Sequence, residues 1–325
     1  MTGNKLLSIQ GLTTEFPTPQ GPLVAVNGVD LEVARGEVLG IVGESGSGKT
    51  VLGLSAMGLV GLPGKVTAGR ILFDGQDLTR HTEAQWQAIR GKRIAMVFQD
   101  PTTSLNPVQR IGAQMIEALQ AHRDISKDAA KRMVLEAMVR VGINSPKERL
   151  LAYPHQFSGG MRQRVVIATA LLNEPDLIIA DEPTTALDVT VQSQILRDVR
   201  RLCQDTGTAI IWVSHDLGVV AQIAHRVAVM YAGRIVEQGM TNRLLKTPSH
   251  PYTAGLIASM PANAERGERL RSIPGGLPQL SNLPVGCAFA PRCPQASAAC
   301  EVLPELTSTS AEHAVRCVSP LNEAA

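Results

Sequence analysis

The chain has few aromatic residues, almost no excess charge and no long apolar run. Only 3% of its 325 residues are aromatic, and its formal net charge is +2. A net charge this small gives no electrostatic case for nucleic acid as the main partner. The longest apolar run, residues 165–172, is far too short to span a bilayer. The hydrophobic content of 44% still suffices for a real core, in one large domain or two modest ones.

Cysteine is also scarce, and it is placed unevenly. Cys203 stands alone, whereas the other four cysteines crowd the C-terminal tail: Cys287, Cys293, Cys300 and Cys317. The N-terminus lacks the apolar stretch and cleavage site of a signal peptide, so we expect a cytoplasmic chain whose membrane role must come through a partner. In that reducing compartment, clustered thiols suggest a metal site before disulfides. Cys203 falls on the apolar side of a predicted helix and is expected to be a packed core thiol.

Residues 43–50 read Gly-Glu-Ser-Gly-Ser-Gly-Lys-Thr and fit the phosphate-loop pattern GxxxxGK[ST]. The apolar run at 37–42 predicts a buried strand before this loop, and residues 51–59 predict the helix after it. Lys49 is expected to reach the β- and γ-phosphates of a nucleotide, and the Thr50 hydroxyl to hold Mg²⁺. A chance match is expected in about one chain in a hundred of this length. The residues predicted to touch nucleotide are Gly43, Ser45, Gly46, Ser47, Gly48, Lys49 and Thr50.

Apolar runs and helical patterns alternate along most of the chain, which predicts an α/β fold. Ser126 is expected to N-cap a helix that ends at Gly142. Further helices are expected at 111–122 and 191–203, and the helical stretch at about 100–168 looks like an insertion between two parts of an α/β domain. Strands at 6–9 and 24–26 are expected at a sheet edge, around a turn at 17–22. The other predicted strands are 29–33, 69–75 with its turn, 93–99, 177–182 and 209–213.

The tail from residue 246 onward has a different composition. It holds half of the chain's 20 prolines. Proline at that density predicts neither long helices nor central strands. The tail is therefore expected to be a loop-rich appendage, disordered unless something staples it.

Two further stretches predict nucleotide chemistry. Asp181 and Glu182 end a strand, where one carboxylate can bind the Mg²⁺ shell and the next can polarise an attacking water. A charged pair after a strand is common, but residues 157–163 supply a second anion-binding helix start, with Ser158 as N-cap and Gly159 and Gly160 leaving backbone N–H groups bare. The helical insertion separates the two phosphate-binding loops. Two copies arranged head to tail would let the Ser158 loop of one chain meet the Lys49 loop of the other.

These motifs, in this order, resemble those of the ATP-binding cassette (ABC) ATPases over residues 1 to about 245. The resemblance implies a P-loop NTPase (RecA-like) cassette of α/β class with a helical subdomain at about 100–168. A loop-rich, cysteine-containing extension then covers 246–325. The motifs that carry the resemblance are residues 43–50, Gln99, Ser158-Gly159-Gly160, Asp181-Glu182, Ala186-Leu187-Asp188 and Ser214-His215-Asp216.

The family resemblance also implies roles for single residues. Phe16 would stack on adenine, although its position alone favours an ordinary core residue. Gln99 would touch Mg²⁺ and sense the γ-phosphate, with Thr50 and Asp181 as further magnesium ligands. Glu182 would be the general base, and Asp188 would lie at the dimer interface. His215 would contact the γ-phosphate, although a His after a strand is more often structural. Met161 replaces the family's usual glutamine, and no loss of function is expected from it.

A narrower resemblance concerns the oligopeptide/dipeptide/nickel importer ATPases, and especially the dipeptide and oligopeptide "D" subunits. It rests on residues 98–107, 230–234, 250–253, 273–275, 284–287 and 292–293. It implies an ATPase beneath two membrane permeases, on the cytoplasmic face of the membrane. Its partners would be a second, often paralogous ATPase subunit and an extracytoplasmic solute-binding protein. Nickel or glutathione uptake, a soluble ATPase of DNA repair or translation, and a metal-binding module with a vestigial cassette are the alternatives.

For the tail cysteines the resemblance implies a [4Fe–4S] cluster, since relatives with this tail carry one. Soft thiolates select zinc or iron–sulfur, and four thiols suit either. Cys287, Cys293, Cys300 and Cys317 include no tight C-x₂₋₄-C pair of the kind that zinc ribbons use. Structural Zn²⁺ remains the alternative.

Overall fold

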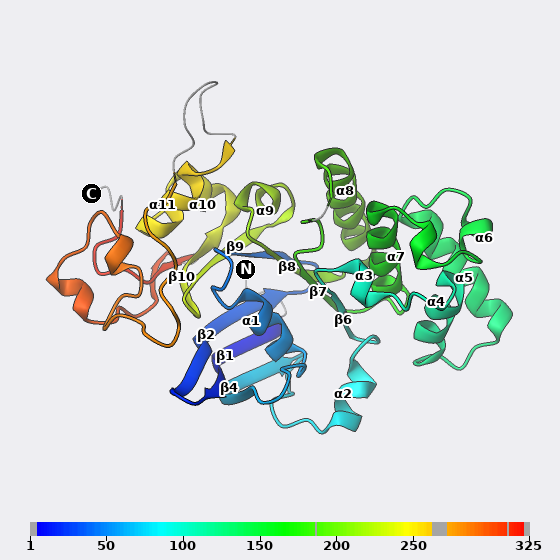
Figure 1. Ribbon diagram of the computed structural model, residues 1–325, viewed down its shortest axis with the longest axis horizontal. Coiled ribbons are helices and arrows are strands. Elements are labelled where there is room, and N and C mark those ends of the chain that lie inside the picture. The colour runs from blue at the N-terminus through cyan, green and yellow to red at the C-terminus, as the bar shows by residue number, and fades with distance from the viewer. Residues whose placement is uncertain (1–4, 186, 262–271, 311, 322–325) are drawn as a thin grey trace. The chain divides into compact units, whose positions relative to one another are not determined.

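The computed structural model describes residues 5–185, 187–261, 272–310 and 312–321 (Figure 1). The chain forms two compact units. The first unit contains residues 34–37 and 80–211, and the second contains residues 5–33, 38–79 and the chain from 212 onward. Each unit is described by itself. No helix among the described residues combines the length and the apolar content needed to cross a membrane.

The second unit begins with a four-stranded sheet in the order β2-β1-β4-β5. Its strands are β1 (Lys5–Thr18), β2 (Gly21–Ala34), β4 (Lys65–Phe73) and β5 (Gln76–Asp77). β1 pairs antiparallel with β4, so that Leu7 lies opposite Phe73. β2 is an edge strand as predicted, but the prediction of an edge for residues 6–9 is wrong. All four of these residues are buried, because β1 has a strand on each side and covered faces.

A second set of strands in this unit runs in the order β11-β12-β10-β9-β3. They are β3 (Val38–Val42), β9 (Arg226–Tyr231), β10 (Arg234–Met240), β11 (Thr307–Ser310) and β12 (His313–Val315). β3 pairs parallel with β9, and all five of its residues are buried, which confirms the buried strand predicted before the phosphate loop. Gly40 on β3 lies so close to α9 (Leu217–Ile223) that a Cβ there would be 2.1 Å from Val220 Cγ1. The strand and the helix pack with almost no space between them.

In its described residues, 246–261, 272–310 and 312–321, the tail holds only short elements, as its proline content predicts. After α10 (Thr241–Lys246) come α11 (Pro251–Ala258) and the 3₁₀ helices η3 (Ala290–Arg292) and η4 (Ala298–Glu301). The prediction that the tail has no central strand is wrong, since β12 lies between β10 and β11. The physical reason is the placement of proline: Pro304 and Pro320 flank these two strands and leave their N–H groups intact. The tail is thus stapled to β10 by backbone pairing.

The first unit contains a pair of parallel strands and a group of helices. β6 (Ile94–Val97) pairs with β7 (Leu177–Asp181), and β8 (Ala209–Ser214) continues the chain toward the second unit. Figure 1 shows α4, α5, α6 and α7 gathered together. The helices of this unit are α2 (Glu83–Ile89), α3 (Pro101–Ser104), α4 (Ile111–Gln120), α5 (Lys127–Arg140), α6 (Pro146–Arg149), α7 (Gly159–Leu171) and α8 (Val189–Thr206), with the 3₁₀ turn η1 (Pro154–Gln156).

Several sequence predictions for this unit are confirmed. Ser126 caps α5 by accepting a hydrogen bond from the Ala129 N–H. The predicted apolar stripe of α5 faces inward, with Ala130, Val134 and Met138 fully buried. Cys203 is buried on α8, and burial raises the pKa of its thiol to about 12. It is a core thiol, as expected.

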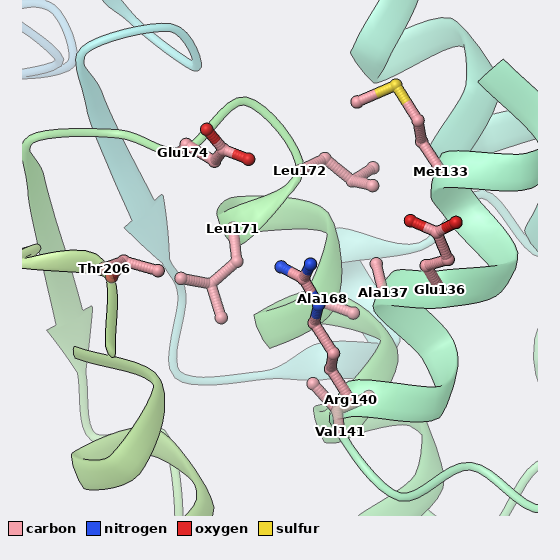
Figure 2. Close-up of a pocket in the computed structure, with 10 residues that line it drawn as sticks. All are labelled: Met133, Glu136, Ala137, Arg140, Val141, Ala168, Leu171, Leu172, Glu174 and Thr206. Carbon is pink, nitrogen blue, oxygen red and sulfur yellow. The ribbon is translucent and has the colours of Figure 1, made fainter. Parts of the chain in front are cut away.

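A small hollow between α5 and α7 has a volume of about 70 Å³ (Figure 2). Its floor is apolar, and Arg140 extends from α5 toward Ala168 and Leu171 of α7. Glu136 and Glu174 lie at its margin. None of the phosphate-binding motifs contributes to it, so it belongs to the packing of the helices.

Candidate functional site

The phosphate loop connects β3 to α1 (Lys49–Ala56) in a conformation that requires glycine. Gly46 and Gly48 have φ values of 85° and 102°, which L side chains rarely adopt. A Cβ on Gly48 would lie 2.4 Å from the Ala25 carbonyl oxygen, and one on Gly43 would lie 2.1 Å from that of Met230. The loop therefore lies directly against the backbone of β2 and β9, and these two strands limit the conformations that it can adopt.

Lys49 is buried at the first position of α1, with 4% of its surface exposed. Its Nζ donates hydrogen bonds to the carbonyl oxygens of Gly43 and Glu44 at 2.8 and 2.9 Å, and lies 3.5 Å from Ser47 Oγ. The ammonium group thus occupies the concave side of the loop. Ser45, Gly46 and Thr50 are exposed at its surface, where a ligand can reach them.

Glu44, in a variable position of the loop pattern, has partners that the sequence does not predict. Its N–H donates to Tyr252 Oη at 2.8 Å. Its carboxylate pairs with Arg292 of the tail, at 2.7 Å from Oε2 to Nη1 and 3.0 Å from Oε1 to Nη2. Arg292 attracts attention in the sequence only as the neighbour of Cys293. No local pattern could join residues 248 positions apart.

In the first unit, the structure brings Gln99 and Glu182 together. Gln99 lies two residues beyond β6 and donates from Nε2 to Glu182 Oε2 at 3.3 Å. Thr185 Oγ1 donates to the same oxygen at 2.9 Å. Asp181, the last residue of β7, is 3% exposed. Glu182 has a φ of 44°, a left-handed conformation that is strained for a side chain of this size.

The second predicted anion-binding stretch has the expected N-cap. Ser158 Oγ accepts a hydrogen bond from the Met161 N–H at 3.3 Å, and α7 begins at the next residue. A Cβ on Gly159 would meet nothing within 4 Å, so the helix start is open to a ligand. A Cβ on Gly160 would lie 2.8 Å from Val191 Cγ1. The packing of α7 against α8 therefore favours glycine at this position.

Asp188 caps the next helix, α8, by accepting hydrogen bonds from the N–H groups of Thr190 and Val191. Its side chain is exposed. Ala186, which belongs to the same sequence motif, lies outside the described residues.

Two predicted nucleotide contacts lie on the second unit. Phe16 is on β1, partly exposed, with its ring so close to Gly64 that a Cβ there would be 2.4 Å from Cε1. Partial exposure of an aromatic ring suits a stacking platform better than a core position. His215 directly follows β8 and is exposed, next to Asp216, which caps α9.

The four tail thiols gather around one pocket. Cys287, Cys293, Cys300 and Cys317 all line it, together with His250 and Phe289. Burial raises the pKa of the Cys287, Cys293 and Cys317 thiols, and neighbouring thiols of the tail, Cys300 among them, raise it further. Even so, no group of three or more metal-ligating side chains close enough to hold an ion is present among the described residues.

His250 adds a buried polar atom at this pocket. It is 1% exposed, and its Nδ1 accepts a hydrogen bond from the Tyr252 N–H at 3.0 Å. Burial lowers its pKa to about 4, so the neutral ring carries its proton on Nε2. That Nε2 has no hydrogen-bond partner within the part of the chain that the structure describes. Buried N–H groups in proteins almost always have an acceptor.

Comparison with known proteins gives two family matches. Residues 26–185 match the ABC transporter family, and residues 236–300 match the oligopeptide/dipeptide transporter C-terminal region. The chain is 50% identical to the dipeptide transport ATP-binding protein DppD of Bacillus subtilis, over 96% of this chain and 94% of that protein. It is 52% identical to the oligopeptide transport ATP-binding protein OppD of Bacillus subtilis, over 89% and 81% of the two chains.

Solved structures give the same result for the fold. The ATP-binding cassette MJ0796, determined as a dimer in a post-hydrolysis state with ADP and Pi, aligns with a TM-score of 0.66 and 26% identity. The alignment covers 72% of this chain and 98% of MJ0796. The cassette cbiO1 of Clostridium perfringens aligns with a TM-score of 0.64 and 28% identity, over 75% and 91% of the two chains.

Proposed function

Since this chain belongs to the ABC transporter family, we propose that it is the ATP-hydrolysing subunit of an importer of dipeptides and oligopeptides. The observation that carries the proposal is that the cassette and the tail each match a family model of transporter ATPases. The cassette matches the ABC transporter family, and the tail matches the C-terminal region of oligopeptide/dipeptide transporters. We propose a functional division at about residue 245, with 1–245 as the nucleotide-binding domain and 246–325 as the extension.

The phosphate loop would bind the ATP phosphates. The buried Lys49 ammonium supplies positive charge on the concave side of the loop, beside the N-terminus of α1. Phe16 would stack on the adenine ring. Magnesium would be held by Thr50, Gln99 and Asp181, and when bound it would neutralise the phosphate charge. Oxygen donors of this kind are the ligands that magnesium prefers.

Glu182 would act as the general base. Gln99 and Thr185 both donate to its Oε2, which restrains the carboxylate, and the carboxylate would accept a proton from the attacking water. The strained φ of Glu182 supports a functional role, since such conformations gather at active sites. His215 would contact the γ-phosphate from its exposed position after β8.

The second phosphate-binding loop would act across a pair of cassettes. The open helix start at Ser158, Gly159 and Gly160 would close over the nucleotide of a second ATPase subunit, with Asp188 at the interface. The partners we propose are that second subunit, often a paralogue, two transmembrane permeases and an extracytoplasmic solute-binding protein. The chain would lie on the cytoplasmic face of the membrane, held there by the permeases.

The tail thiols would hold a [4Fe–4S] cluster. Four soft donors line one pocket, and the unpartnered Nε2–H of His250 at the same pocket fits a cluster sulfide as acceptor. When bound, the cluster would crosslink a segment that has little core of its own. Zn²⁺ remains the alternative, since it takes the same thiolate ligands.

The proposal can be tested by transport in cells that lack this subunit. Wild-type protein is expected to restore uptake of labelled dipeptides and oligopeptides, and Lys49→Ala is expected not to. Restored uptake of Ni²⁺ or glutathione in place of peptides would establish the alternative substrates. If adding the wild-type protein to cells that retain the permeases leaves the uptake of peptides, Ni²⁺ and glutathione unchanged, the importer role is contradicted.

A further inference from the structure

Arg292 of the tail is a fully engaged side chain. Its guanidinium forms a bidentate pair with Glu44 in the phosphate loop, at 2.7 and 3.0 Å. The remaining N–H groups donate to the carbonyl oxygens of Pro274 at 2.8 Å and Gly275 at 3.4 Å, and to Tyr231 Oη at 3.3 Å. All five donors of a guanidinium are therefore used. So many partners fix both the position and the plane of the group.

The surroundings of Arg292 leave little of its side chain open to water. Its side chain is 7% exposed and that of Glu44 is 26% exposed. The guanidinium lies 5.8 Å from the ring centre of Tyr231 and 5.9 Å from that of Phe289. Tyr252 packs edge-on against Tyr231 at 4.6 Å and contacts Phe289 at 5.4 Å. The chain has only three tyrosines and five phenylalanines, and this cluster contains two of those tyrosines and one of those phenylalanines. The low local dielectric strengthens the ion pair.

Glu44 connects this cluster to the ligand side of the phosphate loop. Its carboxylate is held by Arg292, its N–H by Tyr252 Oη, and its carbonyl oxygen accepts from Lys49 Nζ at 2.9 Å. The Glu44 peptide is thus fixed from the tail on one side and contacts Lys49 on the other. Any shift of the carboxylate would move a carbonyl that positions the ammonium.

We propose that Arg292 is a positioning residue for ATP binding, which acts through Glu44 to hold the phosphate loop and Lys49 in their binding geometry. This inference rests on the proposed role of the loop as the nucleotide site. It gives the tail a function in ATP affinity, beyond its own folding. A bidentate guanidinium is the side chain suited to this task, because a lysine can provide the charge but not the two parallel bonds.

The tail also has contacts that do not involve the phosphate loop, and these provide a matched control. Arg316 donates from Nε to the Ile235 carbonyl at 3.0 Å and from Nη1 to that of Pro304 at 3.0 Å. It is half-buried, and like Arg292 it precedes one of the four thiols. Arg316→Gln therefore removes tail contacts next to a thiol without touching Glu44.

The test measures binding of a fluorescent ATP analogue and steady-state ATP hydrolysis by the full-length chain and its variants. Arg292→Gln and Glu44→Gln are each expected to raise Kd and KM for ATP by roughly five- to twentyfold, within the usual range of coupling between sites, with a smaller effect on kcat. Because both remove the same pair, the double variant is expected to match the single ones. Arg292→Lys is expected to fall between wild type and Arg292→Gln, and Arg316→Gln to bind like wild type.

Three results would decide against the inference. Equal losses of affinity in Arg292→Gln and Arg316→Gln would show a general effect of tail docking. Additive losses in the double variant would show that the two residues act separately. If Arg292→Gln binds the ATP analogue with wild-type affinity while Lys49→Ala does not bind it, the inference about Arg292 is wrong but the role of the loop stands. Normal binding by Lys49→Ala would overturn the role of the loop itself. If thermal unfolding shows that Arg292→Gln does not fold, Arg292→Lys and Glu44→Gln carry the test.

Discussion

The Gln99 side-chain amide lies 3.3 Å from the Glu182 carboxylate, although the two residues are 83 positions apart. One follows β6 and the other follows β7, and these strands pair in parallel. The carboxyl ends of parallel neighbours meet at one edge of a sheet, which is where ligands bind in α/β folds. Thr185 donates to the same carboxylate oxygen at 2.9 Å. Two neutral donors therefore restrain the orientation of the Glu182 carboxylate.

Glu182→Gln is expected to bind ATP and hydrolyse it very slowly. The amide keeps the shape of the side chain but cannot accept a proton, so kcat should fall by about 10²- to 10⁴-fold. Because ATP persists, the variant should accumulate as a closed pair of cassettes. Steady-state hydrolysis and sedimentation with ATP measure the two effects. Glu136→Gln, on the exposed face of α5, is the matched control and should behave as wild type. Near-normal turnover in Glu182→Gln would show that another group is the base.

Hydrolysis by the isolated chain is expected to depend on pairing with a second cassette. If Lys49 of one subunit must meet the Ser158 helix start of another, specific activity should rise with protein concentration. Ser158→Arg removes the N-cap oxygen and blocks the open helix start, so its activity should stay low at every concentration. Activity and sedimentation measured across a dilution series check this. Full activity in demonstrably monomeric protein would contradict it.

The core position of Cys203 makes a prediction about reactivity and stability. Burial raises the pKa of this thiol to about 12, so at pH 8 it holds almost no thiolate, and alkylation of the native chain should spare it. Because the folded pKa lies above the unfolded one, the protonated thiol favours the folded state. The free energy of unfolding should therefore fall as pH rises from about 9 to about 12.

Cys203→Ala should lessen that alkaline fall and lower the free energy of unfolding at neutral pH by about 1–2 kcal/mol. Mass spectrometry after alkylation and urea unfolding at two pH values test these expectations. Rapid modification of Cys203 in the folded chain would show that it is accessible.

Local rules predicted much of the fold and of the site. The phosphate loop, the Ser126 and Ser158 caps and the buried strand before the loop all follow from residues within one or two turns of each other. The pairing of distant segments does not follow from such rules. The place of β1 inside its sheet, the insertion of β12 beside β10 and the Arg292–Glu44 pair depend on which surfaces meet after folding. Charge and proline content do not indicate which distant strand or side chain each of these segments will contact.

The tail thiols are expected to bind a [4Fe–4S] cluster in protein purified without oxygen. Such protein should be brown and contain about four irons per chain, as this cluster type implies. Cys293→Ser should lose the colour, because a serine hydroxyl is a poor replacement for a thiolate ligand. Cys203→Ser is the matched control, since it removes a buried cysteine that lies outside the thiol pocket, and it should stay brown. Iron analysis and the visible spectrum measure both variants. If the anaerobic protein is colourless and contains one zinc and no iron, the site is a structural zinc site and the cluster prediction is wrong. If it contains neither metal, the prediction that the four thiols share a metal ligand is wrong.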